Sequence, residues 1–140
     1  MPPDWNLANF INGEIRMPTP RIIEMDESVS LKQQGRVEVG PVVFINKFTI
    51  KPEQLNEFLK VWKAATVIER RQPGYISAQF YRGIAGSNVF INYVVWETAQ
   101  HHTQAVQQPE FQAVLETYPP GVVESPHLFQ KLAIPDICVA

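Results

Sequence analysis

The sequence predicts an α+β fold with a ferredoxin-like β-α-β-β-α-β sheet, and three observations point to this class. Segments typical of strands and helices follow one another in that order from residue 41 onward. Turn-forming residues separate these segments. The tripeptide Phe-Ile-Asn occurs at residues 44–46 and again at residues 90–92, in two strands that are neighbours in this fold. The 140 residues suffice for one domain with its own core.

The first strand is expected at residues 42–50, VVFINKFTI, which are rich in β-branched and aromatic side chains. Pro52 is suited to the first turn of the helix that follows. One face of this helix should be buried, because apolar residues recur at helical spacing: Leu55, Phe58, Leu59, Trp62 and Ala65. The helix should end with Glu69, Arg70 and Arg71, which are interpreted as a solvated helix end.

The next two strands form a hairpin. Residues 75–82, YISAQFYR, alternate as a strand does, and residues 83–88, GIAGSN, are typical of a loop. Residues 89–96, VFINYVVW, predict the third strand. The sequence therefore places two antiparallel strands directly after the first helix.

The second helical region follows this hairpin. Thr98 is a suitable N-cap for a helix that continues to about Gln107, and Pro109 can begin a further short helix. The motif Pro-Pro-Gly at residues 119–121 should end that helix. Residues 127–134, HLFQKLAI, are predicted as the last strand.

Alternation along the strands assigns side chains to the two faces of the sheet. The face toward the helices should carry one set from the first and third strands: Phe44, Asn46, Phe48, Phe90, Asn92, Val94 and Trp96. The opposite face of the third strand is also apolar, with Val89, Ile91, Tyr93 and Val95. A sheet that is apolar on both faces needs a second cover. We expect a homodimer in which two sheets pack face to face, or else a cover made by the N-terminal residues alone.

Residues 1–40 are predicted to form an extended N-terminal arm, and residues 41–140 the ferredoxin-like domain. The arm carries four prolines and shows no sustained periodicity. Residues 10–15, FINGEI, have an Asn-Gly pair between apolar residues, which favours a small hairpin. We expect this arm to wrap around a core, either its own or that of a partner subunit.

Composition narrows the classes of function. The formal charge is −2, and there is no basic stripe, so nucleic acid and anionic membranes are not expected partners. No apolar run is long enough to span a membrane, and the N-terminus does not resemble a signal peptide. The single cysteine excludes an intrachain disulfide and a thiolate zinc cluster. A cytoplasmic location is predicted.

Three stretches, taken in order, resemble the antibiotic biosynthesis monooxygenase family. They are PGYISAQFYR at residues 73–82, NVFINYVVWETAQHH at residues 88–102 and PEFQAV at residues 109–114. The resemblance covers about residues 41–134. It implies a dimeric α+β barrel with a pocket between sheet and helices. It also implies a small oxygenase that converts anthrone-type polyketides to quinones with O2 and without metal, flavin or haem.

The resemblance also suggests site residues. Asn92 and Trp96 match the Asn and Trp of the family's strand motif, and His102 lies where such oxygenases carry a Tyr. The family's pocket Arg on the following helix has no counterpart here. Amide and indole N–H groups could stabilise a substrate enolate, and an imidazole could act as base. The catalytic candidates are thus Asn92, Trp96 and His102. The substrate-binding candidates, which suit a flat aromatic substrate, are Asn46, Phe44, Phe48, Trp62 and Phe90.

Other interpretations of these residues stay open. Asn92, Trp96 and His102 could each be structural core residues. The same barrel could hold a cyclase or isomerase that uses His102 without O2, or a ligand-binding dimer without catalysis. A haem-binding relative would need an axial His, and only His102 could serve. No cofactor and no metal are predicted, since adjacent residues such as His101 and His102 point about 100° apart on a helix.

Overall fold

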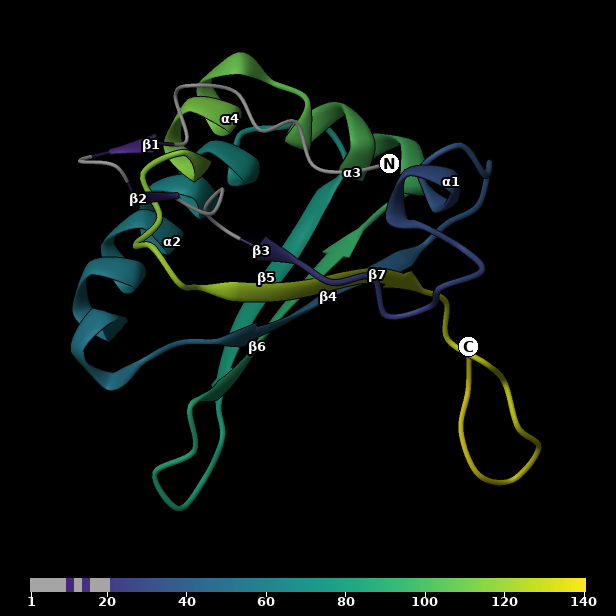
Figure 1. Cartoon of the computed structure of the whole chain (residues 1–140). Helices are drawn as coiled ribbons and strands as arrows, with labels where there is room; N and C mark the ends of the chain where they lie inside the picture. Colours follow the sequence, from purple (N-terminus) through teal and green to yellow (C-terminus); the bar gives the residue numbers. More distant parts are fainter. Residues whose placement is uncertain (1–9, 12–13, 16–20) are drawn as a thin grey trace.

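The computed structural model describes residues 10–11, 14–15 and 21–140. A five-stranded sheet forms the centre, and the longer helices lie on one of its faces (Figure 1). The elements other than the first three short strands are α1 (Leu31–Gln34), β4 (Val42–Thr49), η2 (Pro52–Gln54), α2 (Leu55–Arg70), β5 (Tyr75–Arg82), β6 (Val89–Trp96), α3 (Ala99–Val106), α4 (Pro109–Leu115) and β7 (Val123–Phe129). The ferredoxin-like α+β fold is thereby confirmed.

The strand order is β3-β7-β4-β6-β5. Strands β4, β5, β6 and β7 make the four antiparallel strands of the ferredoxin-like sheet, and β3 (Arg21–Ile22) adds a short parallel pairing at the β7 edge. The repeated Phe-Ile-Asn tripeptide correctly indicated neighbouring strands, since Asn46 and Asn92 lie directly opposite each other in the β4–β6 ladder.

Helix α2 is amphipathic, as its apolar spacing predicts. Phe58 is buried against the sheet, and Leu55 and Trp62 pack in part against the same core. Ala65 is buried against Phe111 of α4. The prediction was wrong for Leu59, which is exposed. It was also wrong for Glu69, which is buried rather than solvated, because the last turn of α2 is still covered by α4 and the sheet.

The last strand differs from its predicted range of residues 127–134. β7 instead runs from Val123 to Phe129 and includes Pro126. A proline fits here because β3 pairs only with Val123 and Glu124, so the outer side of β7 is unpaired at Pro126. The strand ends at Phe129, which pairs with Val43 near the start of β4.

The arm contains structure of its own. Strands β1 (Phe10–Ile11) and β2 (Glu14–Ile15) pair antiparallel, as the Asn-Gly signal predicts, while the turn residues 12–13 lie outside the described residues. Residues 21–40, here called the arm segment, dock on the chain's own sheet. The Gln34 side chain donates a hydrogen bond to the Leu128 carbonyl (2.8 Å) and accepts one from the Leu128 N–H (2.9 Å). It thus satisfies backbone groups at the free edge of β7.

The sheet face opposite the helices is left open. No helix of the described chain covers it in Figure 1, and the arm segment lies at the β7 edge and the helix side instead. Tyr81 and Val89 are exposed there. Across the described residues, no helix is long and apolar enough to cross a membrane.

Candidate functional site

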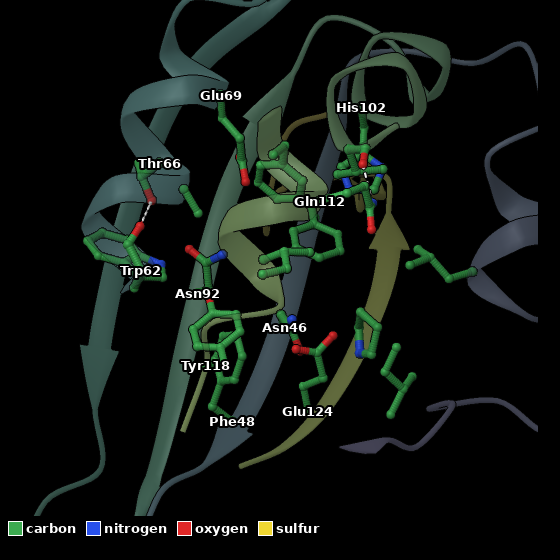
Figure 2. Close-up of a pocket in the computed structure, with 18 of the residues that line it drawn as sticks. Asn46, Phe48, Trp62, Thr66, Glu69, Asn92, His102, Gln112, Tyr118 and Glu124 are labelled. Carbon is green, nitrogen blue, oxygen red and sulfur yellow. Dashed lines mark hydrogen bonds between the residues drawn. The ribbon is translucent and has the colours of Figure 1, made fainter. Parts of the chain in front are cut away.

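A cavity of about 320 Å³ lies between the sheet and its helices. Its floor comes from β4, β6 and β7, its roof from α2, α3 and α4, and one side from the arm segment (Figure 2). Apolar atoms make up most of the lining surface, although half of the twenty lining residues are polar: Glu24, Lys32, Asn46, Thr66, Glu69, Asn92, His102, Gln112, Tyr118 and Glu124. A volume of this size is in the range of small-ligand pockets.

Two asparagine side chains lie on the floor. Asn46 on β4 and Asn92 on β6 are cross-strand partners, and both are buried. The side-chain oxygen of each has no hydrogen-bond partner within the described part of the chain. A buried amide without partners costs about 1–3 kcal/mol. Two such groups side by side in a hollow are therefore typical of a surface that binds a ligand.

Helix α2 forms one wall. Trp62, Thr66 and Glu69 recur at helical spacing and face the cavity. The Thr66 hydroxyl donates to the Trp62 carbonyl oxygen at 2.8 Å, so it is satisfied within the helix. The indole N–H of Trp62 is buried and has no acceptor among the described residues. Trp62 thus offers a donor to a ligand.

His102 lies on α3, whose start is set by Thr98. The Thr98 hydroxyl accepts a hydrogen bond from the His101 N–H and caps the helix, so His102 points toward the sheet. The His102 ring stacks on Phe44 with a centroid distance of 4.4 Å, and neither ring nitrogen has a partner in the described structure. Burial lowers the pKa of His102 to about 4, so the imidazole is neutral at pH 7 and is a weak base.

Two buried carboxyl groups line the same cavity. Burial raises the pKa of Glu69 to about 8. Burial also raises the pKa of Glu124 to about 7, and the Asn46 side chain opposes this rise. The pKa of the nearby Tyr118 hydroxyl is raised, first by burial and then by the charges of Glu124 and Glu69. At neutral pH the cavity therefore holds a protonated Glu69 and a partly ionised Glu124.

The arm segment closes the cavity beside β7. It contributes Ile22, Glu24, Leu31 and Lys32 to the lining. The segment is held there by backbone pairing, in which the Ile23 N–H donates to the Glu124 carbonyl oxygen at 2.8 Å. The pairing that builds this wall therefore also holds the backbone of Glu124, whose buried carboxyl group lines the cavity.

The structure brings six of the eight predicted site residues to this cavity: Asn46, Phe44, Phe48, Trp62, Asn92 and His102. The other two do not line it. Trp96 is fully buried in the core behind His102, with 6.0 Å between the two ring centroids. Phe90 packs in the aromatic core beside Phe80. Tyr81 and Tyr93 contact each other and do not line the cavity either.

Sequence reasoning missed both buried carboxyls. Glu69 was assigned to solvent because two arginines follow it, although it lies seven residues after Trp62 and hence on the same helical face. Glu124 precedes the predicted last strand, residues 127–134, so strand alternation did not assign its side chain to a face of the sheet. Within residues 21–140 the structure holds no cluster of three or more His, Cys, Asp or Glu side chains that could bind a metal.

Comparison with known proteins identifies a family model and a sequence relative that match this chain. Residues 41–117, more than half of the chain, match the family model for antibiotic biosynthesis monooxygenases. An uncharacterized Synechocystis protein, sll1783, is 27% identical over 92 residues, which span 66% of this chain and 63% of that protein. The chain thus covers less than two thirds of this relative's length.

Solved structures share the fold. SnoaB of Streptomyces nogalater, a cofactor-independent oxygenase, has a TM-score of 0.63 at 23% identity, with 70% of this chain and 99% of SnoaB covered. A candidate monooxygenase of Shewanella loihica PV-4 has a TM-score of 0.58 at 27% identity, with the same coverage of 70% and 99%. With its family-model match, its ferredoxin-like sheet and a cavity under the helices, the chain belongs to the antibiotic biosynthesis monooxygenase family.

Proposed function

We propose that the protein is a cofactor-independent monooxygenase that oxidises an aromatic small molecule with O2. The substrate would be anthrone- or quinol-like, as in polyketide-derived compounds. The observation that carries this proposal is the aromatic cavity with unpaired polar atoms buried in its lining. Membership of the family and the cofactor-independent oxygenase activity of the fold neighbour SnoaB support it.

The cavity suits a flat substrate that carries a carbonyl or phenol oxygen. Phe44, Phe48 and Trp62 provide aromatic contact area on the floor and on one wall. Asn46 and Asn92 provide amide groups that can hydrogen-bond to the oxygen of an enolate as charge develops there. Because the site is buried, such hydrogen bonds act in a low dielectric and are stronger than in water.

The proposed reaction needs no cofactor to balance. An anthrone carbon with two hydrogens loses both and gains one oxygen atom from O2, and the second oxygen atom leaves as water. The protein must remove a proton, stabilise the electron-rich enolate that reacts with O2, and keep bulk water out. The buried amides serve the second task, and the packed walls serve the third.

The test is O2 uptake by chelator-treated protein with a panel of anthrones and hydroquinones. We expect quinone to form with a stoichiometry of one O2 for each anthrone. Asn92→Ala should lower kcat by about 100-fold, as loss of one oxyanion donor does. Asn88→Ala, in the exposed β5–β6 loop, is the matched control and should leave kcat unchanged. Wild-type uptake no faster than the uncatalysed reaction would refute the proposal.

A second candidate function is a proton-transfer isomerase or cyclase on the same cavity. The two buried carboxyls, Glu69 and Glu124, favour it, because an acid and a base can move protons without O2. Equal turnover under nitrogen and under air would support this candidate over the oxygenase. Ligand binding without any turnover would leave a non-catalytic binding protein.

We further propose that a second copy of the chain covers the open sheet face. The exposed side chains of Tyr81 and Val89 lie on this face, and the described part of the arm does not cover it. Burial of such a patch is favourable at about 25 cal/mol for each Å². Sedimentation equilibrium should give a dimer, and Tyr81→Asp should give monomers. A monomeric wild-type protein would contradict this assembly.

A further inference from the structure

We propose that Glu124 is the catalytic base of the cavity and that Glu69 is the proton donor on the wall opposite to it. This inference rests on the proposed function and deepens it. His102 is the base expected from the sequence, whereas the structure places the Glu124 carboxyl group beside the Asn46 side chain in the cavity.

The position of Glu124 suits proton abstraction. Its side chain rises from β7 into the cavity beside Asn46, and Figure 2 shows the two groups pointing toward each other. Only 8% of Glu124 is exposed, and it forms no ion pair in the described structure. Its backbone is held on both sides, by β4 and by the arm segment. A carboxylate held in this way is next to the floor on which the substrate oxygen would bind.

The position of Glu69 suits the opposite role. It enters the cavity from α2, on the far side of Asn92 from Glu124 in Figure 2. It makes no ion pair in the described structure, and burial keeps it protonated at neutral pH. Tyr118 lies within electrostatic range of both carboxyls. The two carboxyl groups thus line one cavity from different elements, β7 and α2, so that one can accept a proton while the other donates one.

The surrounding charged groups agree with this assignment. Glu24 and Lys32 line the cavity from the arm segment, and His102 lines it from α3. Burial lowers the pKa of His102 to about 4, far below neutral, whereas the pKa of Glu124 is about 7. A base is most effective when its pKa is near the working pH. Glu124 is therefore the better base at pH 7.

The proton and electron steps balance. Glu124 takes one hydrogen of the anthrone carbon as a proton, and the electron pair stays on the substrate as an enolate. The enolate passes one electron to O2, the two radicals couple at carbon, and the resulting peroxide takes the proton back from Glu124. Glu124 then removes the second hydrogen as the O–O bond breaks, and Glu69 protonates the departing oxygen to give water. The proton on Glu124 returns to Glu69.

The first step can be measured without O2. Unsubstituted anthrone is incubated in D2O under nitrogen, and deuterium entry at its CH2 group is followed by NMR. Wild-type protein should accelerate this exchange above the buffer rate, with a rate that rises with pH and levels off above about pH 7. Glu124→Gln should lower the exchange rate at least 100-fold. Binding of anthraquinone, followed by quenching of tryptophan fluorescence, should change less than about threefold.

Controls separate a chemical role from a structural one. Glu97→Gln removes an exposed carboxyl outside the cavity and should exchange as the wild type does. Glu124→Asp keeps a carboxylate and should recover part of the exchange rate together with its pH dependence. Glu69→Gln should lower the rate of quinone formation, because Glu69 donates a proton in a later step.

The outcomes distinguish this inference from the proposed function. Exchange that depends on Glu124 but comes without O2 uptake would support the base and refute the oxygenase. O2 uptake with exchange that is equal in wild type and Glu124→Gln would support the oxygenase and overturn the base. Absence of exchange in the wild type would also overturn it, as would an equal loss of exchange in Glu124→Asp and Glu124→Gln.

Discussion

Replacement of Glu69 by glutamine should remove one large contribution to the pH dependence of folding stability. Burial raises the pKa of Glu69 from 4.5 to about 8. In the unfolded chain this carboxyl loses its proton near pH 4.5, whereas the folded protein keeps the proton until about pH 8. Because the folded state binds the proton more tightly, the free energy of unfolding should fall as pH rises from about 4.5 to about 8, and then level off.

The size of this effect follows from the same pKa values. At about 1.4 kcal/mol for each tenfold change in the acid dissociation constant, a rise from 4.5 to about 8 corresponds to roughly 5 kcal/mol. Part of the loss has already occurred at pH 5. We therefore expect Glu69 to account for a decrease of about 4 kcal/mol in the free energy of unfolding between pH 5 and pH 9.

The assay is urea unfolding of wild type and Glu69→Gln at pH 5, 7 and 9, in buffers of equal ionic strength. The comparison uses the change with pH, since a buried glutamine amide has hydrogen-bonding needs of its own. Glu124 shifts in the same direction, but it is present in both proteins and cancels. Glu97→Gln, which removes an exposed carboxyl, should keep the wild-type pH dependence. Equal pH dependence in wild type and Glu69→Gln would refute the assignment of Glu69 as a buried, neutral acid.

Two further predictions concern the arm and Trp96. Deletion of residues 1–38 removes β3 and the Gln34 contacts to β7, so it should lower the free energy of unfolding measured with urea. It should also weaken anthraquinone binding by about tenfold in a fluorescence titration, because the arm segment lines the cavity. Unchanged values in both assays would show that the arm is not part of the site. Trp96→Phe leaves a gap in the core behind His102, so it should lower the free energy of unfolding by about 2 kcal/mol. The kcat for O2 uptake should stay within about threefold of the wild-type value. A loss of kcat at unchanged stability would show a direct role of the indole.

The sequence by itself determined the fold and the direction of the central strands. Alternation in residues 42–50 and 89–96, the helical spacing after Pro52 and the Thr98 cap each act over a few neighbouring residues. These local preferences agree with one another, so they were enough to predict the order of strands and helices. Face assignment from alternation also placed Asn46 and Asn92 together, because the period of a strand leaves no choice of side.

The depth of burial was not available from the sequence. Trp96 and Asn92 alternate to the same face, yet only Asn92 reaches the cavity, because α3 places His102 between the indole and the hollow. The solvent exposure of the last turn of a helix likewise depends on which other elements pack against that turn. Glu69 precedes two arginines and resembles a solvated end, but α4 folds over that turn and buries it.

Tertiary structure alone decided which distant segments share the site. Glu124 lies outside the matched residues 41–117, and the arm segment precedes them, yet strand pairing brings both to the cavity. The pairing of β3 with β7 depends on contacts between residues about 100 positions apart, which no local pattern encodes. The pKa values of the two buried carboxyls follow from that assembly, because a side chain is desolvated only when the surrounding elements have closed over it.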